Sequence, residues 1–251
     1  MRSVVLVHGL MGTVTAHYER CRELWTHPVV EVGLPGHGLD EQLPEHPARA
    51  AVRRVHDAIL AQPEPPVVVG LSYLGAAVAL RAAESVAESV HGVVISGYSL
   101  IVSPKTLRLW LAGFTRMAAE QHRTREYLAG LHGPEWERLL ASTVAELDDG
   151  CLILPQQQDI ESLGTPVLLI NGALLENERL AVQPAVEAGA DVAIVGGAGH
   201  LVPQDSPRAF VAGVEEFLDR VSERRTVFHE RRRVAERAAS ARPVPAGRDG
   251  V

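Results

Sequence analysis

Residues 66–75 read PVVVGLSYLG. Three valines lead into Gly70, Ser72 stands between two bulky residues, and Gly75 closes the stretch. A β-branched run of this length, bounded by proline and glycine, predicts a strand buried on both faces. The serine that follows it is either a nucleophile held on a sharp turn or the N-cap of a helix. The rest of the sequence bears on that choice.

Short apolar runs of the same kind recur along the chain, with helix-length segments between them. Strands separated by helices predict βαβ units and an α/β fold, in which a parallel sheet has helices on both faces. The predicted strands are SVVLV (3–7), PVVEV (28–32), PVVVG (66–70), GVVIS (92–96), PVLLI (166–170) and DVAIV (191–195). Helices are predicted near residues 14–26, 46–61, 73–89, 177–188 and 206–222.

The spacing breaks once, between the fourth and fifth predicted strands. The segment there is far longer than one crossover helix needs, and residues 104–147 read as two or three helices. Such an insertion usually lies over the strand ends as a cap or lid. We therefore expect a core at residues 1–99 and 163–222, a helical cap at 100–162 and a tail at 223–251.

The tail is basic, with eight arginines against four acidic residues, and its last residues show no apolar period. A frayed helix followed by a disordered end is the prediction. A basic contact arm is the alternative.

Composition limits the partners of the chain. A net charge of −7 and an aromatic fraction of 4% argue against a nucleic-acid partner. Cys21 and Cys151 have neither metal-ligand nor disulfide-framework spacing, which suggests a reducing compartment, the cytoplasm. No apolar run approaches the length of a membrane span. We expect a small-molecule partner, no nucleic acid and no membrane; the sequence does not indicate an oligomeric state.

The context of Ser72 favours the nucleophile. In the elbow motif G-x-S-x-G, a strand runs into a helix through a tight, strained turn that projects the serine hydroxyl. Gly70 fits the first small position, whereas Leu74 occupies the second and glycine comes only at Gly75. The motif is therefore imperfect, and the N-cap alternative stays open.

A serine nucleophile needs a histidine base, and on this topology the members come in the order serine, acid, histidine. His200 lies in GGAGHLVPQDSP, after the last predicted strand and before a helix. This loop would bring its imidazole over the strand ends, beside Ser72. A surface histidine is the alternative, but the position predicts the base.

The stretch HGLMG (8–12) directly follows the first predicted strand. In serine hydrolases the loop at this place donates a backbone N–H to the oxyanion hole, together with the N–H of the residue after the nucleophile. The predicted donors are the main chains of Leu10 and Tyr73. We interpret His8 as a structural residue of the loop, and His37 as part of a second glycine-rich turn.

Taken together, HGLMG, LPGHG, GLSYLG, PVLLING and GAGHLVPQDSP resemble the α/β-hydrolase superfamily in order and spacing, over about residues 3–221. The resemblance implies a three-layer α/β fold with a mostly parallel sheet and a helical cap that shapes the substrate pocket. It also implies a Ser-His-acid triad, with no metal and no cofactor.

The acid departs from the family pattern. The family usually has an aspartate three residues after the glycine that follows the penultimate strand, and that position holds Leu175. Glu176 comes next, and its longer side chain could absorb the offset, so we predict Glu176 as the acid. Glu178, or no functional acid at all, are the alternatives. The other location known in the family, after the preceding strand, holds no carboxylate.

Three functions fit these residues. The first is hydrolysis of a small, fairly apolar ester, thioester or related acyl compound. The second is non-hydrolytic chemistry at the same site, such as a lyase, acyl-transfer or cyclisation reaction. The third is a non-catalytic ligand-binding homologue. Leu74 and Leu175 favour it, because they stand where the family usually has glycine and aspartate. Ser72, His200 and the glycine-rich loops favour an enzyme.

Overall fold

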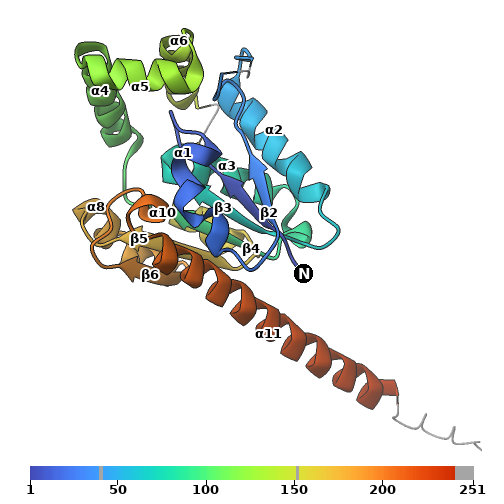
Figure 1. Cartoon of the computed structure of the whole chain (residues 1–251). Helices are drawn as coiled ribbons and strands as arrows, with labels where there is room; N and C mark the ends of the chain where they lie inside the picture. Colours follow the sequence, from blue (N-terminus) through green and yellow to red (C-terminus); the bar gives the residue numbers. More distant parts are fainter. Residues whose placement is uncertain (40–41, 151–152, 241–251) are drawn as a thin grey trace, which may run out of the picture.

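The computed structural model describes residues 1–39, 42–150 and 153–240 (Figure 1). Six strands form one sheet in the order β2-β1-β3-β4-β5-β6, and all neighbouring pairs are parallel. The strands are β1 (Val4–Val7), β2 (Val29–Val32), β3 (Val67–Leu71), β4 (Gly92–Ser96), β5 (Val167–Gly172) and β6 (Asp191–Val195). The predicted α/β fold and its six strands are confirmed. The four inner strands are buried, whereas the edge strands β2 and β6 are partly exposed, so the prediction of burial on both faces is wrong for these two.

The strand order reverses between β1 and β3. The chain runs from β1 outward to β2, and then returns to the other side of β1 to form β3. In open parallel sheets, ligands bind outside the carboxyl ends of the strands at such a switch point. Gly9 lies in the loop after β1, and Ser72 directly follows β3 as the first residue of α3, so both residues lie at this place.

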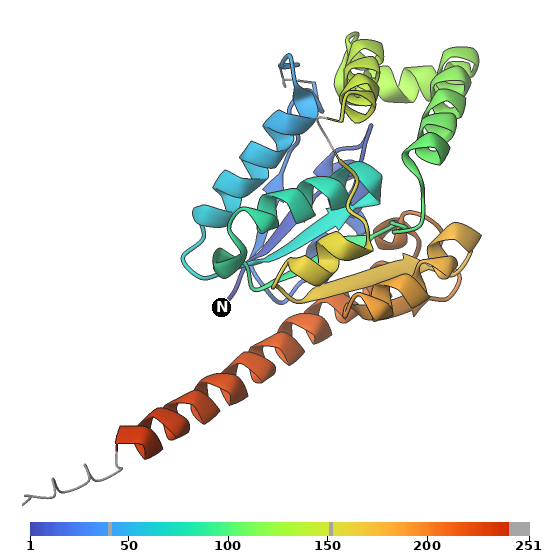
Figure 2. The same cartoon turned by 180° about the vertical axis from the view of Figure 1, so that it is seen from behind.

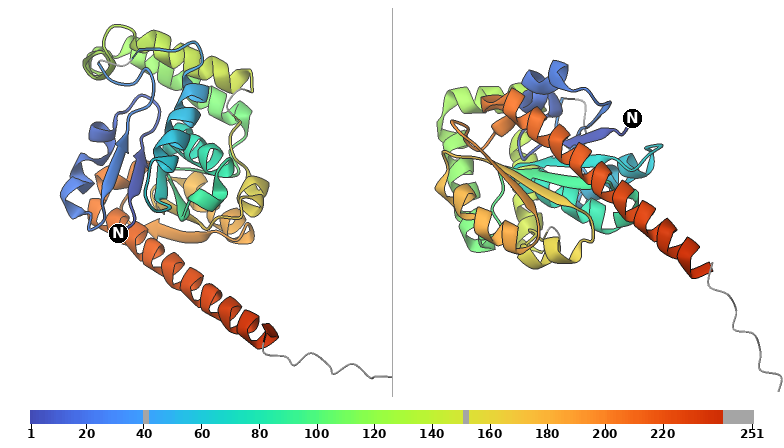
Figure 3. Two further views of the ribbon diagram at one scale, coloured as in Figure 1. Left: turned by 90° about the vertical axis from the view of Figure 1, so that its right-hand side faces the viewer. Right: turned by 90° about the horizontal axis from the view of Figure 1, so that it is seen from below.

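Helices cover both faces of the sheet (Figures 2 and 3). One face carries α2 (Pro47–Leu60), α3 (Ser72–Glu84), α7 (Gln157–Ser162) and α9 (Val182–Glu187). The other carries α1 (Val14–Tyr18), the 3₁₀ helix η1 (Glu19–Leu24), α10 (Val202–Asp205) and α11 (Pro207–Ser240). A second 3₁₀ helix, η2 (Ala87–Ser89), follows α3, and α8 (Glu176–Leu180) follows β5.

The core explains why β1 is apolar throughout. Successive side chains of a strand point to opposite faces. In β1, Val5 and Val7 belong to the apolar cluster under α2 and α3, while Val4 and Leu6 belong to the cluster under α11. All four are buried, so neither face of the strand tolerates a polar residue.

Three helices occupy the segment after β4 where the sequence predicts two or three: α4 (Pro104–Glu120), α5 (His122–His132) and α6 (Trp136–Asp148). We call them the helical insertion; Figure 1 shows them beyond the carboxyl ends of the strands. They have an apolar cluster of their own, which includes Met11 from the loop after β1. The predicted cap also contained α7; this helix packs against α9, and its Ile160 belongs to the apolar cluster that covers one face of the sheet.

The last helix is longer than predicted. It continues past residue 222 to Ser240 and projects from the body of the molecule (Figures 1 and 3). Residues 223–240 contain no glycine or proline and are rich in arginine, glutamate and alanine, all good helix formers. The predicted frayed helix is corrected to that extent; residues 241–251 and Cys151 lie outside the described residues. Within the described ranges, no helix is long and apolar enough to cross a membrane.

Candidate active site

Ser72 lies at the junction of β3 and α3, in a left-handed backbone conformation with φ +63°. Among the described residues, only Met11 shares a positive φ without being glycine. Such a conformation costs on the order of 1–3 kcal/mol and is held only where the surroundings enforce it. An N-cap residue has extended dihedrals instead, and the N-cap of α3 is Leu71. The geometry therefore fits the elbow and not the N-cap.

The imperfect motif has a steric explanation. A Cβ atom on Gly70 would lie 2.3 Å from the carbonyl oxygen of Gly75, and one on Gly75 would lie 2.6 Å from that of His8. Strand β3, helix α3 and the end of β1 therefore meet at Gly70 and Gly75. The second small residue is needed three positions after the serine, and Leu74 faces the cavity described below.

The strain at Ser72 predicts a stability difference between two variants. Glycine adopts a positive φ without steric cost, whereas alanine does not. We expect Ser72→Gly to be more stable than Ser72→Ala by about 1 kcal/mol, measured by urea unfolding of both proteins. Both lack the hydroxyl, so the difference isolates the backbone. Equal stability would mean that the turn is unstrained.

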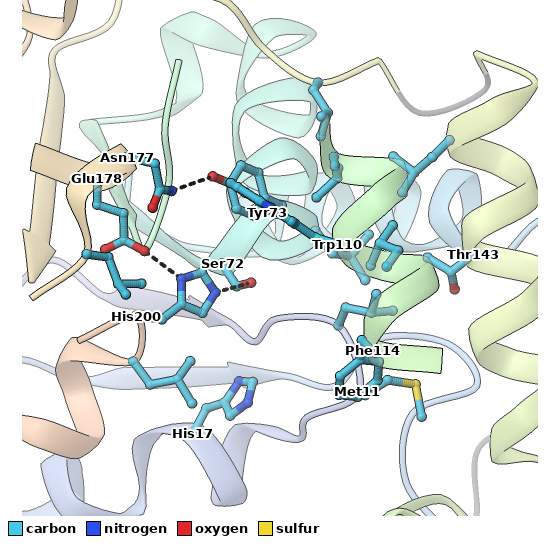
Figure 4. A pocket seen from close by; sticks show the side chains of 18 of the residues that line it. Met11, His17, Ser72, Tyr73, Trp110, Phe114, Thr143, Asn177, Glu178 and His200 are labelled. Carbon is cyan, nitrogen blue, oxygen red and sulfur yellow. Dashed lines mark hydrogen bonds and ion pairs between the residues drawn. The ribbon is translucent and has the colours of Figure 1, made fainter. Parts of the chain in front are cut away.

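His200 joins the serine to a carboxylate (Figure 4). Its Nε2 lies 2.8 Å from Ser72 Oγ, and its Nδ1 lies 2.7 Å from Glu178 Oε1. The His200 loop crosses the end of β5, where a Cβ atom on Gly172 would lie 2.2 Å from the carbonyl oxygen of Gly199. The Gly199 N–H also donates to Asp205 Oδ2 at 2.8 Å. These contacts fix the height of the imidazole over the strand ends.

The carboxylate beside His200 belongs to Glu178, so the prediction of Glu176 is corrected. Glu178 is fully buried, whereas Glu176 is exposed. Helix α8 begins at Glu176, directly after Leu175 as its extended N-cap. Residues two apart on a helix point about 200° apart, so Glu176 faces solvent when Glu178 faces the histidine.

The sequence did contain a signal for Glu178. Glu178, Ala181 and Ala185 have the spacing i, i+3, i+7 of one helix face, and all three are fully buried. Glu176 shares its side of the helix with Leu180, which is exposed. Helical periodicity within 177–188 would have selected the right glutamate, while counting from the end of the strand selected its neighbour.

Asn171 supports the acid and was missed by the sequence analysis. It is fully buried at the end of β5. Its Nδ2 donates to the carbonyl oxygens of Tyr98 at 2.7 Å and Glu178 at 3.2 Å, and its Oδ1 accepts from the Tyr98 N–H at 3.2 Å. One side chain thus ties the end of β4 to the backbone of the residue that carries the carboxylate.

The loop after β1 lies against the serine. A Cβ atom on Gly9 would be 2.7 Å from Ser72 Cβ, so the two segments are in close contact. Leu10 and Tyr73 both line the cavity at this point. Tyr73 lies in the first turn of α3, where N–H groups have no intrahelical acceptor. The structure assigns the Leu10 N–H no acceptor among the described residues.

His8 and His37 have the structural roles that the sequence predicts. His8 Nδ1 donates to the Gly9 carbonyl oxygen at 2.9 Å, and its Nε2 accepts from the Leu34 N–H at 3.0 Å. His37 Nδ1 lies 3.2 Å from the Pro35 carbonyl oxygen, within the second turn. Burial lowers the pKa of His8 well below its ordinary value, so its imidazole is neutral and can accept.

A cavity of about 760 Å³ opens in front of Ser72, between the strand ends and the helical insertion. The insertion contributes an apolar and aromatic wall: Leu107, Trp110, Leu111, Phe114, Tyr127, Leu128 and Leu147. Tyr73 connects this wall to the histidine, since its ring stacks on His200 with 6.1 Å between centroids and meets Trp110 edge-on at 6.0 Å. No group of three or more His, Cys, Asp or Glu side chains in the described ranges could hold a metal ion.

Comparison with known proteins agrees with this geometry. Residues 4–213 match the model of the Alpha/beta hydrolase family. The chain belongs to the α/β-hydrolase family. No match is found among curated proteins.

Solved structures of this family resemble the whole core. The crystal structure of NosK from Streptomyces actuosus is 33% identical, with a TM-score of 0.80 over 88% of this chain and 99% of that one. A thermophilic esterase from Thermogutta terrifontis is 19% identical, with a TM-score of 0.65 over 88% and 90%. A monoacylglycerol lipase from Paleococcus ferrophilus is 21% identical, with a TM-score of 0.59 over 88% and 94%. The last two likenesses establish the fold alone.

Proposed function

We propose that this α/β hydrolase is a serine esterase or thioesterase that acts on a small, fairly apolar acyl substrate. The observation that carries the proposal is the unbroken line from Glu178 through His200 to Ser72, with hydrogen-bond distances of 2.7 and 2.8 Å, at the wall of an apolar cavity. Nucleophile, base and orienting acid within such reach of one another are the requirement for acyl-transfer chemistry.

Each residue of the line has one task. Glu178 accepts from His200 Nδ1–H, which leaves Nε2 unprotonated to accept from the Ser72 hydroxyl. As Oγ attacks the acyl carbon, its proton passes to Nε2; the same proton then goes to the departing alcohol or thiol as the acyl–oxygen or acyl–sulfur bond breaks. Water repeats the sequence on the acyl-enzyme and releases the acid.

The negative charge that develops on the acyl oxygen needs donors in the cavity. The main-chain N–H groups of Leu10 and Tyr73 serve as this oxyanion hole in our proposal, because they flank Ser72 and neither makes a competing hydrogen bond to any residue that the structure describes. The start of helix α3, which carries Tyr73, adds the favourable end of its dipole.

The cavity suggests the substrate class. Its wall is mostly apolar, and no arginine or lysine among the described residues lines it, so these residues offer an anionic substrate no cationic partner. An aliphatic or aromatic acyl group fits such a lining, which drives binding by burial of apolar surface. In this proposal the helical insertion acts as the cap, since its residues form the side of the cavity opposite Ser72.

The test is a panel of p-nitrophenyl esters and acyl thioesters of increasing acyl length, assayed with the wild type and Ser72→Ala. We expect hydrolysis by the wild type and only background rates with the variant. A fluorophosphonate should add to the wild type, and not to Ser72→Ala, by intact mass. Product analysis with an added alcohol or amine separates hydrolysis from acyl transfer. An unmodified, inactive wild type would contradict the proposal.

A further inference from the structure

The mechanism above leaves several polar residues of the cavity wall unused, and one of them is a histidine. His17, on α1, is buried and lines the same cavity as Ser72 and His200 (Figure 4). It is linked to the reacting serine through one residue, because the Gly9 N–H donates to His17 Nδ1 at 3.2 Å and Gly9 packs against Ser72.

The hydrogen bond from Gly9 fixes the tautomer of His17. A ring nitrogen that accepts a hydrogen bond carries no proton, so in the neutral imidazole the proton must be on Nε2. Burial, together with the nearby charge of His200, lowers the pKa of His17 to about 4. At neutral pH this ring is therefore a neutral group that accepts with Nδ1 and donates with Nε2.

Within the described part of the chain, the Nε2–H of His17 has no hydrogen-bond acceptor, and this nitrogen is not sealed off from the cavity that the ring lines. A Cβ atom on Gly12 would lie 2.2 Å from Nε2, which means that a glycine at this position makes room for the ring. A few well-placed polar groups in an apolar cavity normally orient the ligand.

We propose that His17 is a substrate-binding residue whose Nε2–H donates a hydrogen bond to an oxygen of the acyl group attacked by Ser72. This inference rests on the proposed function and adds a specificity to it: the substrate must offer an oxygen acceptor on the Gly9 side of the serine. Because the neutral His17 ring presents a donor to the cavity, it does not compete with His200 for the serine proton. His200 is therefore the base, and His17 is the hydrogen-bond donor.

Two substitutions separate this role from a purely structural one. In His17→Asn, the side-chain oxygen takes the place of Nδ1 and can still accept from Gly9, but the donor at Nε2 is lost. In His17→Gln, the amide nitrogen lies near the place of Nε2 and can still donate, but the acceptor for Gly9 is lost. We expect kcat/KM to fall about 10- to 100-fold in His17→Asn and to stay within about 5-fold of the wild type in His17→Gln.

The reverse order, with His17→Gln impaired and His17→Asn active, would show that His17 only holds the loop, and would overturn the proposal. Equal activity of both variants with the wild type would also overturn it. Thermal unfolding of each variant shows whether the fold is kept.

Two further measurements do not depend on ester hydrolysis. The second-order rate constant of Ser72 labelling by a fluorophosphonate should follow the same order, slower in His17→Asn than in His17→Gln. If the wild type is labelled but hydrolyses no ester, the proposed function fails. The labelling rates of the two variants then still decide the role of His17. In ¹⁵N-labelled wild type, the Nε2–H signal of His17 should shift when Ser72 is phosphonylated. An unchanged signal would overturn the proposal even if neither variant folds.

Discussion

Replacing Glu178 by glutamine is expected to lower kcat by about 10³- to 10⁴-fold with little loss of stability. The side chain keeps its size in a fully buried place, so packing is preserved. What changes is the partner of His200 Nδ1, which lies 2.7 Å from the carboxylate. Steady-state kinetics on the best ester of the panel, together with urea unfolding, measures both effects.

The reason for the large effect lies in the tautomer. A glutamine amide can turn its N–H₂ group toward Nδ1 and donate, which favours the imidazole with its proton on Nε2. That nitrogen then cannot accept from Ser72, 2.8 Å away. The buried carboxylate of Glu178 also stabilises the imidazolium that His200 forms during attack. Its second oxygen, Oε2, has no hydrogen-bond partner among the described residues, so the negative charge acts mainly on His200.

Glu176 provides the matched control. It lies two residues away on the same short helix, but it is exposed and points away from the histidine. Glu176→Gln should keep kcat within about two-fold of the wild type, because it removes the same charge without touching the line of hydrogen bonds. A large loss in Glu176→Gln and none in Glu178→Gln would contradict the geometry.

The contrast between Glu176 and Glu178 shows which parts of the fold and the site can be predicted from the sequence. The strands were predictable because each consists mainly of β-branched and other apolar residues, and the four inner ones are buried on both faces. Ser72 and His200 were predictable because the topology brings the ends of β3 and β6 to one edge of the sheet. The acid depended on the residue at which α8 begins, and a shift of one or two residues turns a helical side chain from the core to solvent.

Contacts between segments far apart in the chain left no signal in the sequence. His132 of α5 accepts from the Gly38 N–H at 3.0 Å and so joins the helical insertion to the turn after β2. A carboxylate of the insertion, Glu146, accepts from the Ala48 N–H at the start of α2. Both pairs are close only after the insertion has packed, because nearly a hundred residues separate the partners.

Four histidines lie close together beside the active site, which predicts a marked sensitivity to acid. The ring of His8 lies 6.2 Å from that of His17 and 5.1 Å from that of His37, and His37 lies 5.5 Å from His132, all between centroids. All four side chains are buried. Burial is the main cause that lowers the pKa of each, and the neighbouring histidines lower it further for His8, His17 and His37.

The direction of the effect follows from linkage. The folded-state pKa is about 4 for His17, about 3 for His37 and well below 6.5 for His8, whereas in the unfolded chain each is about 6.5. Between these values the unfolded state binds more protons, so stability is complete above pH 6.5 and falls as the pH decreases. His17 and His37 each lose about 1.6 kcal/mol of stability between pH 6.5 and 5, about 3 kcal/mol together, and His8 adds to the loss in the same direction. A loss of this size is a large part of the total stability of a domain.

We therefore expect the free energy of unfolding, measured in urea, to be constant from pH 8 to 7 and to drop steeply between pH 6.5 and 5. His37→Asn keeps a donor for the Pro35 carbonyl oxygen but does not titrate, so its stability should decline by about 1.6 kcal/mol less over that range. His122→Gln is the control, because His122 is exposed and its removal should leave the slope unchanged. If His37→Asn shows the same decline as the wild type, the histidine cluster does not cause the acid sensitivity. The pKa values of its rings would then not be lowered in the folded state.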